Sequence, residues 1–235
     1  PDMEDYEISE REDGSFLVAG GSAMTVRNSG SLNSTNILVE GSLDVAGSVT
    51  ASNTRVAGGL LHLGSGTTGG TLNSGTLQVT GGGRLTGNGI VSGSTTIGGA
   101  SAGMLAPGNS PGVISFADLT LGANSTTAME IEGLLGAGLT GGHDLIAVSG
   151  QLVLEEGSKL ALGTSTDFEL ALGQRVQIFD VAPSAITGRF SQVSSEFHNA
   201  VAFNLSTGTV IGLGANGGEG FIDAATATAN QAAML

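Results

Sequence analysis

Residues 37–45 read I-L-V-E-G-S-L-D-V, residues 54–63 read T-R-V-A-G-G-L-L-H-L, and residues 76–85 read T-L-Q-V-T-G-G-G-R-L. In each stretch an alternating apolar and polar run meets a glycine, and a second apolar run follows it. Alternation with a period of two is typical of a β-strand with one buried face. Each stretch therefore predicts a strand, a tight glycine turn and another strand.

The motif V-x-G lies at the centre of each unit, at Val39, Val56 and Val79, and it recurs at Val148. The first three valines lie 17 and then 23 residues apart. A near-period of about 20 residues is the signature of stacked coils, each too small to bury its apolar side chains alone. We therefore predict an all-β fold, a β-solenoid, with these four valines pointing inward as structural residues.

The composition agrees with such a fold and excludes several classes of function. Glycine accounts for 41 of 235 residues, only 12% of residues are charged, and there is no tryptophan or cysteine. Without cysteine there are no disulfides or thiolate metal sites. The net charge of −14 opposes binding to nucleic acid. Hydrophobic residues still reach 40%, which is enough for a core.

The chain divides by composition into four predicted segments. Residues 1–14 hold seven acidic residues and form an acidic leader with no signal peptide, which favours a fragment of a longer chain. Residues 15–139 hold the solenoid coils. Residues 140–212 contain five of the eight phenylalanines and are expected to form a C-terminal β cap. Residues 213–235 form a glycine- and alanine-rich tail, interpreted as a linker to a downstream region.

One stretch matches the pattern of a catalytic serine. Residues 105–112 read L-A-P-G-N-S-P-G, so Gly108 and Gly112 flank Ser110 in a G-x-S-x-G match. A nucleophile elbow joins a strand to a helix, whereas the following V-I-S-F-A-D-L reads as a strand. The Pro107-Gly108 and Pro111-Gly112 pairs are strong turn signals. We therefore interpret this segment as a structural turn.

The other candidate sites are weak. Asp144, beside His143, is expected to cap a turn by accepting hydrogen bonds from local backbone N–H groups. The three histidines, His62, His143 and His198, lack the spacing of a zinc site. Two G-x-G-x-x-G matches, at 64–69 and 212–217, have no helix after them. Calcium binding by Glu155, Glu156 and Asp167 is not expected, and neither a metal nor a cofactor is predicted.

Several longer segments carry a resemblance to a known family. Residues 69–91, 105–131 and 143–154 are similar to the passenger-associated repeat region of bacterial autotransporters. The motifs are L-A-P-G-N-S-P-G, then L-T-L-G-A-N-S-T, then an Asp before a V-x-G strand, and the likeness continues at 172–180 and 186–193. The resemblance implies a right-handed parallel β-helix outside the cell, held at the outer membrane by a missing part of the chain. It also implies type V secretion through a translocator barrel, and a C-terminal region that helps the passenger fold.

We therefore predict a non-catalytic, extracellular structural or adhesive segment of an exported surface protein. It would act as a stiff stalk and as a folding nucleus, with a host surface, a neighbouring cell or a matrix as partner. The first alternative is a self-assembling matrix or filament subunit that associates end to end. A polysaccharide-active enzyme on a β-helix is a weaker alternative, because aromatic platforms for sugars are scarce.

Overall fold

The computed structural model describes residues 8–10, 14–65, 68–108 and 111–214. In this part of the chain the structure is almost entirely β, with one short 3₁₀ helix, η1 (Pro183–Ala185). The strands form an 11-stranded, an eight-stranded and a three-stranded sheet. The predicted all-β class is confirmed. No helix of the described residues is long and apolar enough to cross a membrane.

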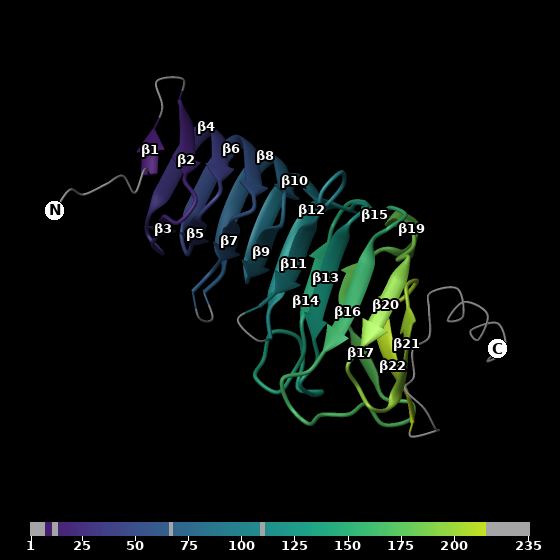
Figure 1. Cartoon of the computed structure of the whole chain (residues 1–235). Helices are drawn as coiled ribbons and strands as arrows, with labels where there is room; N and C mark the ends of the chain where they lie inside the picture. Colours follow the sequence, from purple (N-terminus) through teal and green to yellow (C-terminus); the bar gives the residue numbers. More distant parts are fainter. Residues whose placement is uncertain (1–7, 11–13, 66–67, 109–110, 215–235) are drawn as a thin grey trace.

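The 11-stranded sheet runs along the whole stack (Figure 1). Its first two strands pair antiparallel, and its other pairs are parallel. Its strands are β1 (Ile8–Glu10), β2 (Ser15–Val18), β4 (Ser31–Val39), β6 (Ser48–Ala57), β8 (Gly70–Thr80), β10 (Gly89–Ile97), β12 (Val113–Leu121), β14 (Leu145–Val148), β15 (Leu152–Leu154), β18 (Phe179–Val181) and β19 (Ile186–Gly188).

The eight-stranded sheet lies beside it and is parallel throughout. Its strands are β3 (Ala23–Val26), β5 (Ser42–Val45), β7 (Leu60–Leu63), β9 (Gly83–Gly87), β11 (Gly103–Pro107), β13 (Ser125–Glu130), β16 (Lys159–Gly163) and β20 (Gln192–Ser195).

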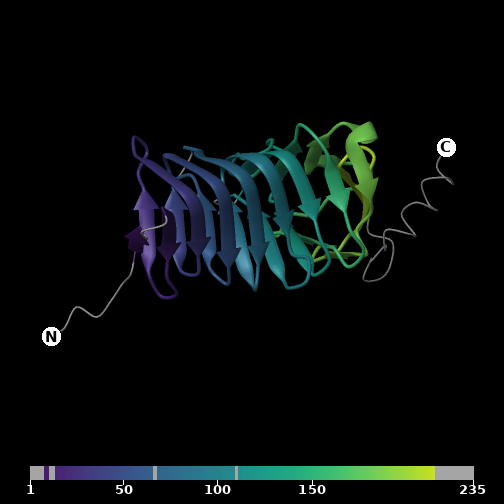
Figure 2. The same ribbon diagram turned by 90° about the horizontal axis from the view of Figure 1, so that it is seen from above.

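Successive strands alternate between the two large sheets from β2 to β13, and each strand from β2 to β12 pairs with the strand two positions further along the chain. Figure 2 shows these strands as a regular stack seen from above. Two successive strands, one in each sheet, are called a coil below, and each new coil pairs with the one before it. Each quoted sequence unit supplies the end of one strand, the glycine turn and the start of the next strand in the other sheet.

Three of the four V-x-G valines lie in one continuous inward row. Val39, Val56 and Val79 are fully buried and pair directly with each other across β4, β6 and β8. The row continues through Ile97, Leu121 and Leu154. Val148 is also buried but belongs to a second inward row, in which it follows Phe116. The V-x-G motif does not reveal which row a valine joins. Strand β12 pairs with β14 through its first half and with β15 through its second half, and Val148 lies on β14.

The glycine of the motif lets the chain leave the strand. Gly58 and Gly81 have φ values of +81° and +61°, in the left-handed region that favours glycine. At Gly41 a Cβ atom would lie 2.3 Å from the carbonyl oxygens of Ala19 and Ser22. A side chain at Gly41 would therefore collide with the backbone of the preceding coil.

The C-terminal end of the stack carries a separate, smaller sheet. β17 (Arg175–Gln177), β22 (Thr209–Gly214) and β21 (Ala200–Asn204) form the three-stranded antiparallel sheet. Beside it Phe179, Phe190 and Phe203 pack together, with ring centroids 5.9 to 6.0 Å apart. Among the described strands, the last ones of the two large sheets, β18, β19 and β20, each pair with one strand only, and the antiparallel sheet is separate from both.

The predicted segment boundaries fall as follows. The boundary between 139 and 140 lies in the connection from β13 to β14, and parallel pairing continues beyond it to β20. Of the acidic leader, residues 8–10 pair with β2, and 1–7 and 11–13 lie outside the described residues. Of the tail, only residues 213 and 214 are described.

Candidate functional site

The G-x-S-x-G segment links β11 to β12. Pro107 is the last residue of β11, and β12 begins at Val113, directly after Gly112. Ser110 lies outside the described residues, as does residue 109. The segment therefore joins a strand of one sheet to a strand of the other, where a nucleophile elbow would lead into a helix.

The two glycines of this corner touch each other. Gly108 has a φ of +99°, and a Cβ atom on it would lie 2.5 Å from the Gly112 nitrogen. A Cβ on Gly112 would lie 2.1 Å from the Gly108 Cα atom. Close approach of the backbone thus explains why the motif needs glycine at both ends.

Asp144 holds this corner in place. Its Oδ1 atom accepts a hydrogen bond from the Gly112 N–H, and its Oδ2 atom accepts one from the Glu130 N–H, both at 2.7 Å. Only 3% of Asp144 is exposed. On the other side, the Asn88 side-chain oxygen accepts a hydrogen bond of 2.9 Å from the Val113 N–H. One corner is therefore fixed by side chains from the coils before and after it.

Burial raises the pKa of Asp144 to about 7. The N–H groups of Glu130 and Gly112 act in the opposite direction, and the carboxylates of Glu130 and Glu132 add to the rise. The charge of this buried group therefore changes near neutral pH.

His143 does not form a catalytic pair with Asp144. Burial lowers the pKa of His143, although a hydrogen bond to the backbone of Gln177 opposes this shift, so the ring is neutral at pH 7. Its Nδ1 atom is buried and makes no hydrogen bond. Asp144 directs both oxygens to backbone amides. The arrangement is that of a structural cap, as expected for Asp144, placed on distant rather than local N–H groups.

Other corners use the same device, and the sequence patterns did not reveal them. Asp118 accepts a hydrogen bond from the Gln151 N–H at 2.8 Å. Glu169 accepts hydrogen bonds of 2.9 Å from the N–H groups of His198 and Asn199, and its carboxylate pairs with His198 Nδ1 at 3.0 Å. Each acid lies about 30 residues from its partner, one coil away. No local motif therefore marks these caps.

The remaining candidates are not gathered into a site. The Glu155 carboxylate accepts a hydrogen bond from the Ala123 N–H at 3.2 Å. Among the described residues, no group of three or more His, Cys, Asp or Glu side chains is placed to hold a metal ion.

Neither G-x-G-x-x-G match leads into a described helix. Gly64 follows β7, and backbone hydrogen bonds between Ser65 and Thr68 close a tight turn before β8. Residues 66 and 67 lie outside the described part. Gly212 and Gly214 belong to strand β22, and the rest of that match also lies outside it.

Comparisons of the chain with protein-family models, with curated proteins and with solved structures find no match.

Proposed function

We propose that this protein is a right-handed β-solenoid that serves as a non-catalytic structural segment of an exported surface protein. The observation that carries the proposal is the set of inward apolar rows running through successive coils, exemplified by Val39, Val56 and Val79. Such a stack resists bending, because each coil is hydrogen-bonded to the next along its length. Right-handed crossovers are the general rule for parallel strands of one sheet.

The phenylalanine-rich C-terminal end supports a role in folding. Folding of a solenoid can begin at any group of neighbouring coils and spread to the others. Contacts among Phe179, Phe190 and Phe203 give this end bulkier core side chains than the valine and leucine rows have. We therefore propose that the C-terminal coils form first and template the rest.

Export to the cell surface is supported by the autotransporter-like motifs at 69–91, 105–131 and 143–154 and by the absence of cysteine. In this proposal the protein is exported through a translocator barrel and lies outside the cell. Its partner is a host surface, a neighbouring cell or a matrix.

Pulsed hydrogen exchange during refolding of the whole chain tests the folding role. Amides of β14 to β20 are expected to become protected before those of β4 to β9. Simultaneous protection, or earlier protection of the N-terminal coils, would contradict it.

A second experiment tests export: the full reading frame is expressed in a Gram-negative host, and protease is added to intact cells. Cleavage before lysis is expected, and protection until lysis would overturn the surface assignment.

A self-assembling subunit is a second candidate, favoured by one observation. Among the described strands, β3 pairs only with β5, so it presents one free edge at the N-terminal end. At the other end, β20 likewise pairs only with β16 among these strands, so the eight-stranded sheet has a second free edge there. Light scattering at increasing protein concentration separates the two candidates, because only the assembling subunit gains mass.

A further inference from the structure

Two adjoining open hollows, together called the groove below, lie on the outer face of the eight-stranded sheet. Each has a volume of about 750 Å³, and both include His62 in their linings. Their floor follows cross-strand neighbours on successive coils: Thr25, Asp44, His62, Thr86 and Ala106 on β3 to β11, then Ala128, Ala161 and Ser194 on β13 to β20. Eight strands at about 4.8 Å apart give a length of roughly 34 Å. A groove of this shape suits an extended polymer better than a small molecule.

Some polar side chains on each of the two large sheets are already paired. On the outer face of the 11-stranded sheet, Asn53 donates to the Asn36 side chain and Thr76 donates to Asn53, each at 2.9 Å. In the groove, His62 and Thr86 contact each other at 2.9 Å, which fixes the imidazole.

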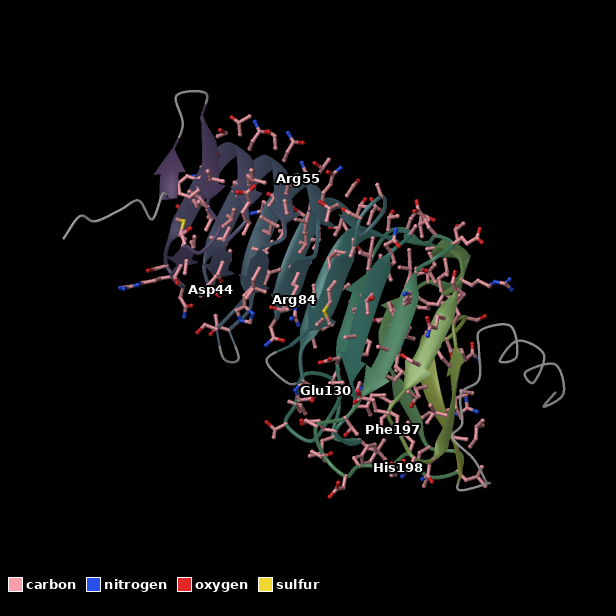
Figure 3. The ribbon with its side chains drawn as sticks, viewed as in Figure 1. Asp44, Arg55, Arg84, Glu130, Phe197 and His198 are labelled. Atoms are coloured by element: carbon pink, nitrogen blue, oxygen red, sulfur yellow. The ribbon has the colours of Figure 1, made fainter. Side chains whose placement is uncertain are left out.

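Three other polar residues of the groove have no side-chain partner among the described residues. Thr25, Asp44 and Arg84 make no side-chain hydrogen bond or ion pair within the described part of the chain. Figure 3 shows Asp44, Arg84 and Glu130 spaced along this face, with Arg55 on the 11-stranded sheet at the opposite edge.

The chemistry of the lining narrows the ligand. Hydroxyl, carboxylate, guanidinium and imidazole groups line the groove, with charges of both signs from Arg84, Asp44, Glu130 and Glu196. Mixed charge does not select an anionic or cationic polymer, whereas donors and acceptors together suit dense neutral hydroxyls. The alanine stretch of the floor leaves room for flat sugar rings.

A polypeptide is a poorer fit. Strands β5 to β16 of the floor are paired on both sides, so they offer no free edge to a peptide strand. The net charge of −14 opposes a nucleic acid.

We propose that this groove binds an extended neutral glycan chain across several coils. The inference goes beyond a stalk function and requires only the two-sheet architecture, so it does not depend on export. Since the chain has no tryptophan and one tyrosine, each sugar is held by hydrogen bonds and not by stacking. Binding should therefore be weak per sugar and should grow with the number of sugars bound.

Native electrophoresis in gels that contain a soluble neutral polysaccharide tests the proposal. The neutral polysaccharides are dextran, a β-glucan, a mannan and a galactan, and heparin is the acidic polysaccharide used for comparison. At least one neutral polysaccharide is expected to retard the protein. Combined His62→Ala and Arg84→Ala substitutions are expected to weaken binding about tenfold, as for two lost hydrogen bonds. Arg55→Ala, an exposed arginine on the other sheet, is the matched control and should leave retardation unchanged.

Three outcomes would overturn the proposal: no retardation by any neutral polysaccharide, retardation by heparin alone, or equal retardation of the double variant. Thermal melting confirms that all variants are folded, which is expected because His62 and Arg84 point outward. Calorimetry with purified oligomers of the retarding polysaccharide supplies a second measurement. Affinity should rise from the trisaccharide to the octasaccharide, and equal affinity would mean a local site instead of a groove.

Discussion

Replacing Val79 with aspartate tests the inward row directly. Val79 is fully buried on β8 and lies between Val56 and Ile97 of the neighbouring coils. The next residue back, Gln78, is exposed on the same strand. Gln78→Asp therefore introduces the same side chain on the same strand, but on the opposite face.

The two substitutions should differ by several kcal/mol in their effect on the free energy of unfolding. A carboxyl group at position 79 has no partner in an apolar row, so its pKa should rise by about three units, equivalent to about 4 kcal/mol at neutral pH. Losing the buried valine removes about 2 kcal/mol more. The sum, about 6 kcal/mol, is comparable to the whole stability of many domains. Gln78→Asp should change stability by about 0.5 kcal/mol or less.

Guanidinium unfolding followed by far-ultraviolet circular dichroism measures both variants. We expect Val79→Asp to lose its folded baseline or to unfold in two steps, since coils near β8 can open separately. Val79→Ala, expected to lose about 2 kcal/mol, keeps the test informative if the aspartate variant does not fold. Equal midpoints for Val79→Asp and Gln78→Asp would refute the inward assignment.

Three further predictions concern the corners and the C-terminal cluster. Asp144→Asn should destabilise the protein by about 1–3 kcal/mol in urea unfolding, because one of two buried N–H groups loses its acceptor. As burial raises the pKa of Asp144 from 3.8 to about 7, the folded state binds this proton more tightly than the unfolded chain. The stability that comes from this proton should be complete below about pH 4 and be lost as pH rises through about 7. If the unfolding free energy of the wild type and of Asp144→Asn changed equally with pH, this prediction would be contradicted. Phe203→Ala should cost about 3–5 kcal/mol and raise hydrogen exchange first in β21 and β22, whereas uniform exchange would argue against a local cap. Gly87→Ala should destabilise far more than Gly99→Ala: both have positive φ, but only at Gly87 would a Cβ lie 2.0 Å from the Leu63 carbonyl oxygen. Equal melting temperatures for these two would refute the close-approach argument.

The sequence anticipated the parts of the structure that depend on local pattern. Alternation around Val39, Val56 and Val79 predicted strands with one buried face, and the three valines share one row. The Pro-Gly pairs of residues 107–112 predicted a corner, and a strand follows it. These features were accessible because a strand and a tight turn are determined within a few residues.

The caps on the corners were not accessible in this way. Asp144 was expected to bond nearby backbone, yet its partners are Gly112 and Glu130, on other segments. No sequence pattern marked Asn88, Asp118 or Glu169 as caps, because each accepts hydrogen bonds from N–H groups about one coil away along the chain. Coil lengths vary, so a fixed spacing does not identify such partners.

By itself the sequence determined the period, the inward valines and the glycines that release each strand, because these follow from side-chain alternation and backbone sterics. Only the tertiary structure decided which strands pair, since β12 accepts both β14 and β15. It also decided that Asn36, Asn53 and Thr76 of neighbouring strands pair with one another, whereas Thr25, Asp44 and Arg84 make no side-chain hydrogen bond in the described part of the chain. Both outcomes depend on contacts between residues about 20 or more positions apart, which stacking brings within a few ångströms.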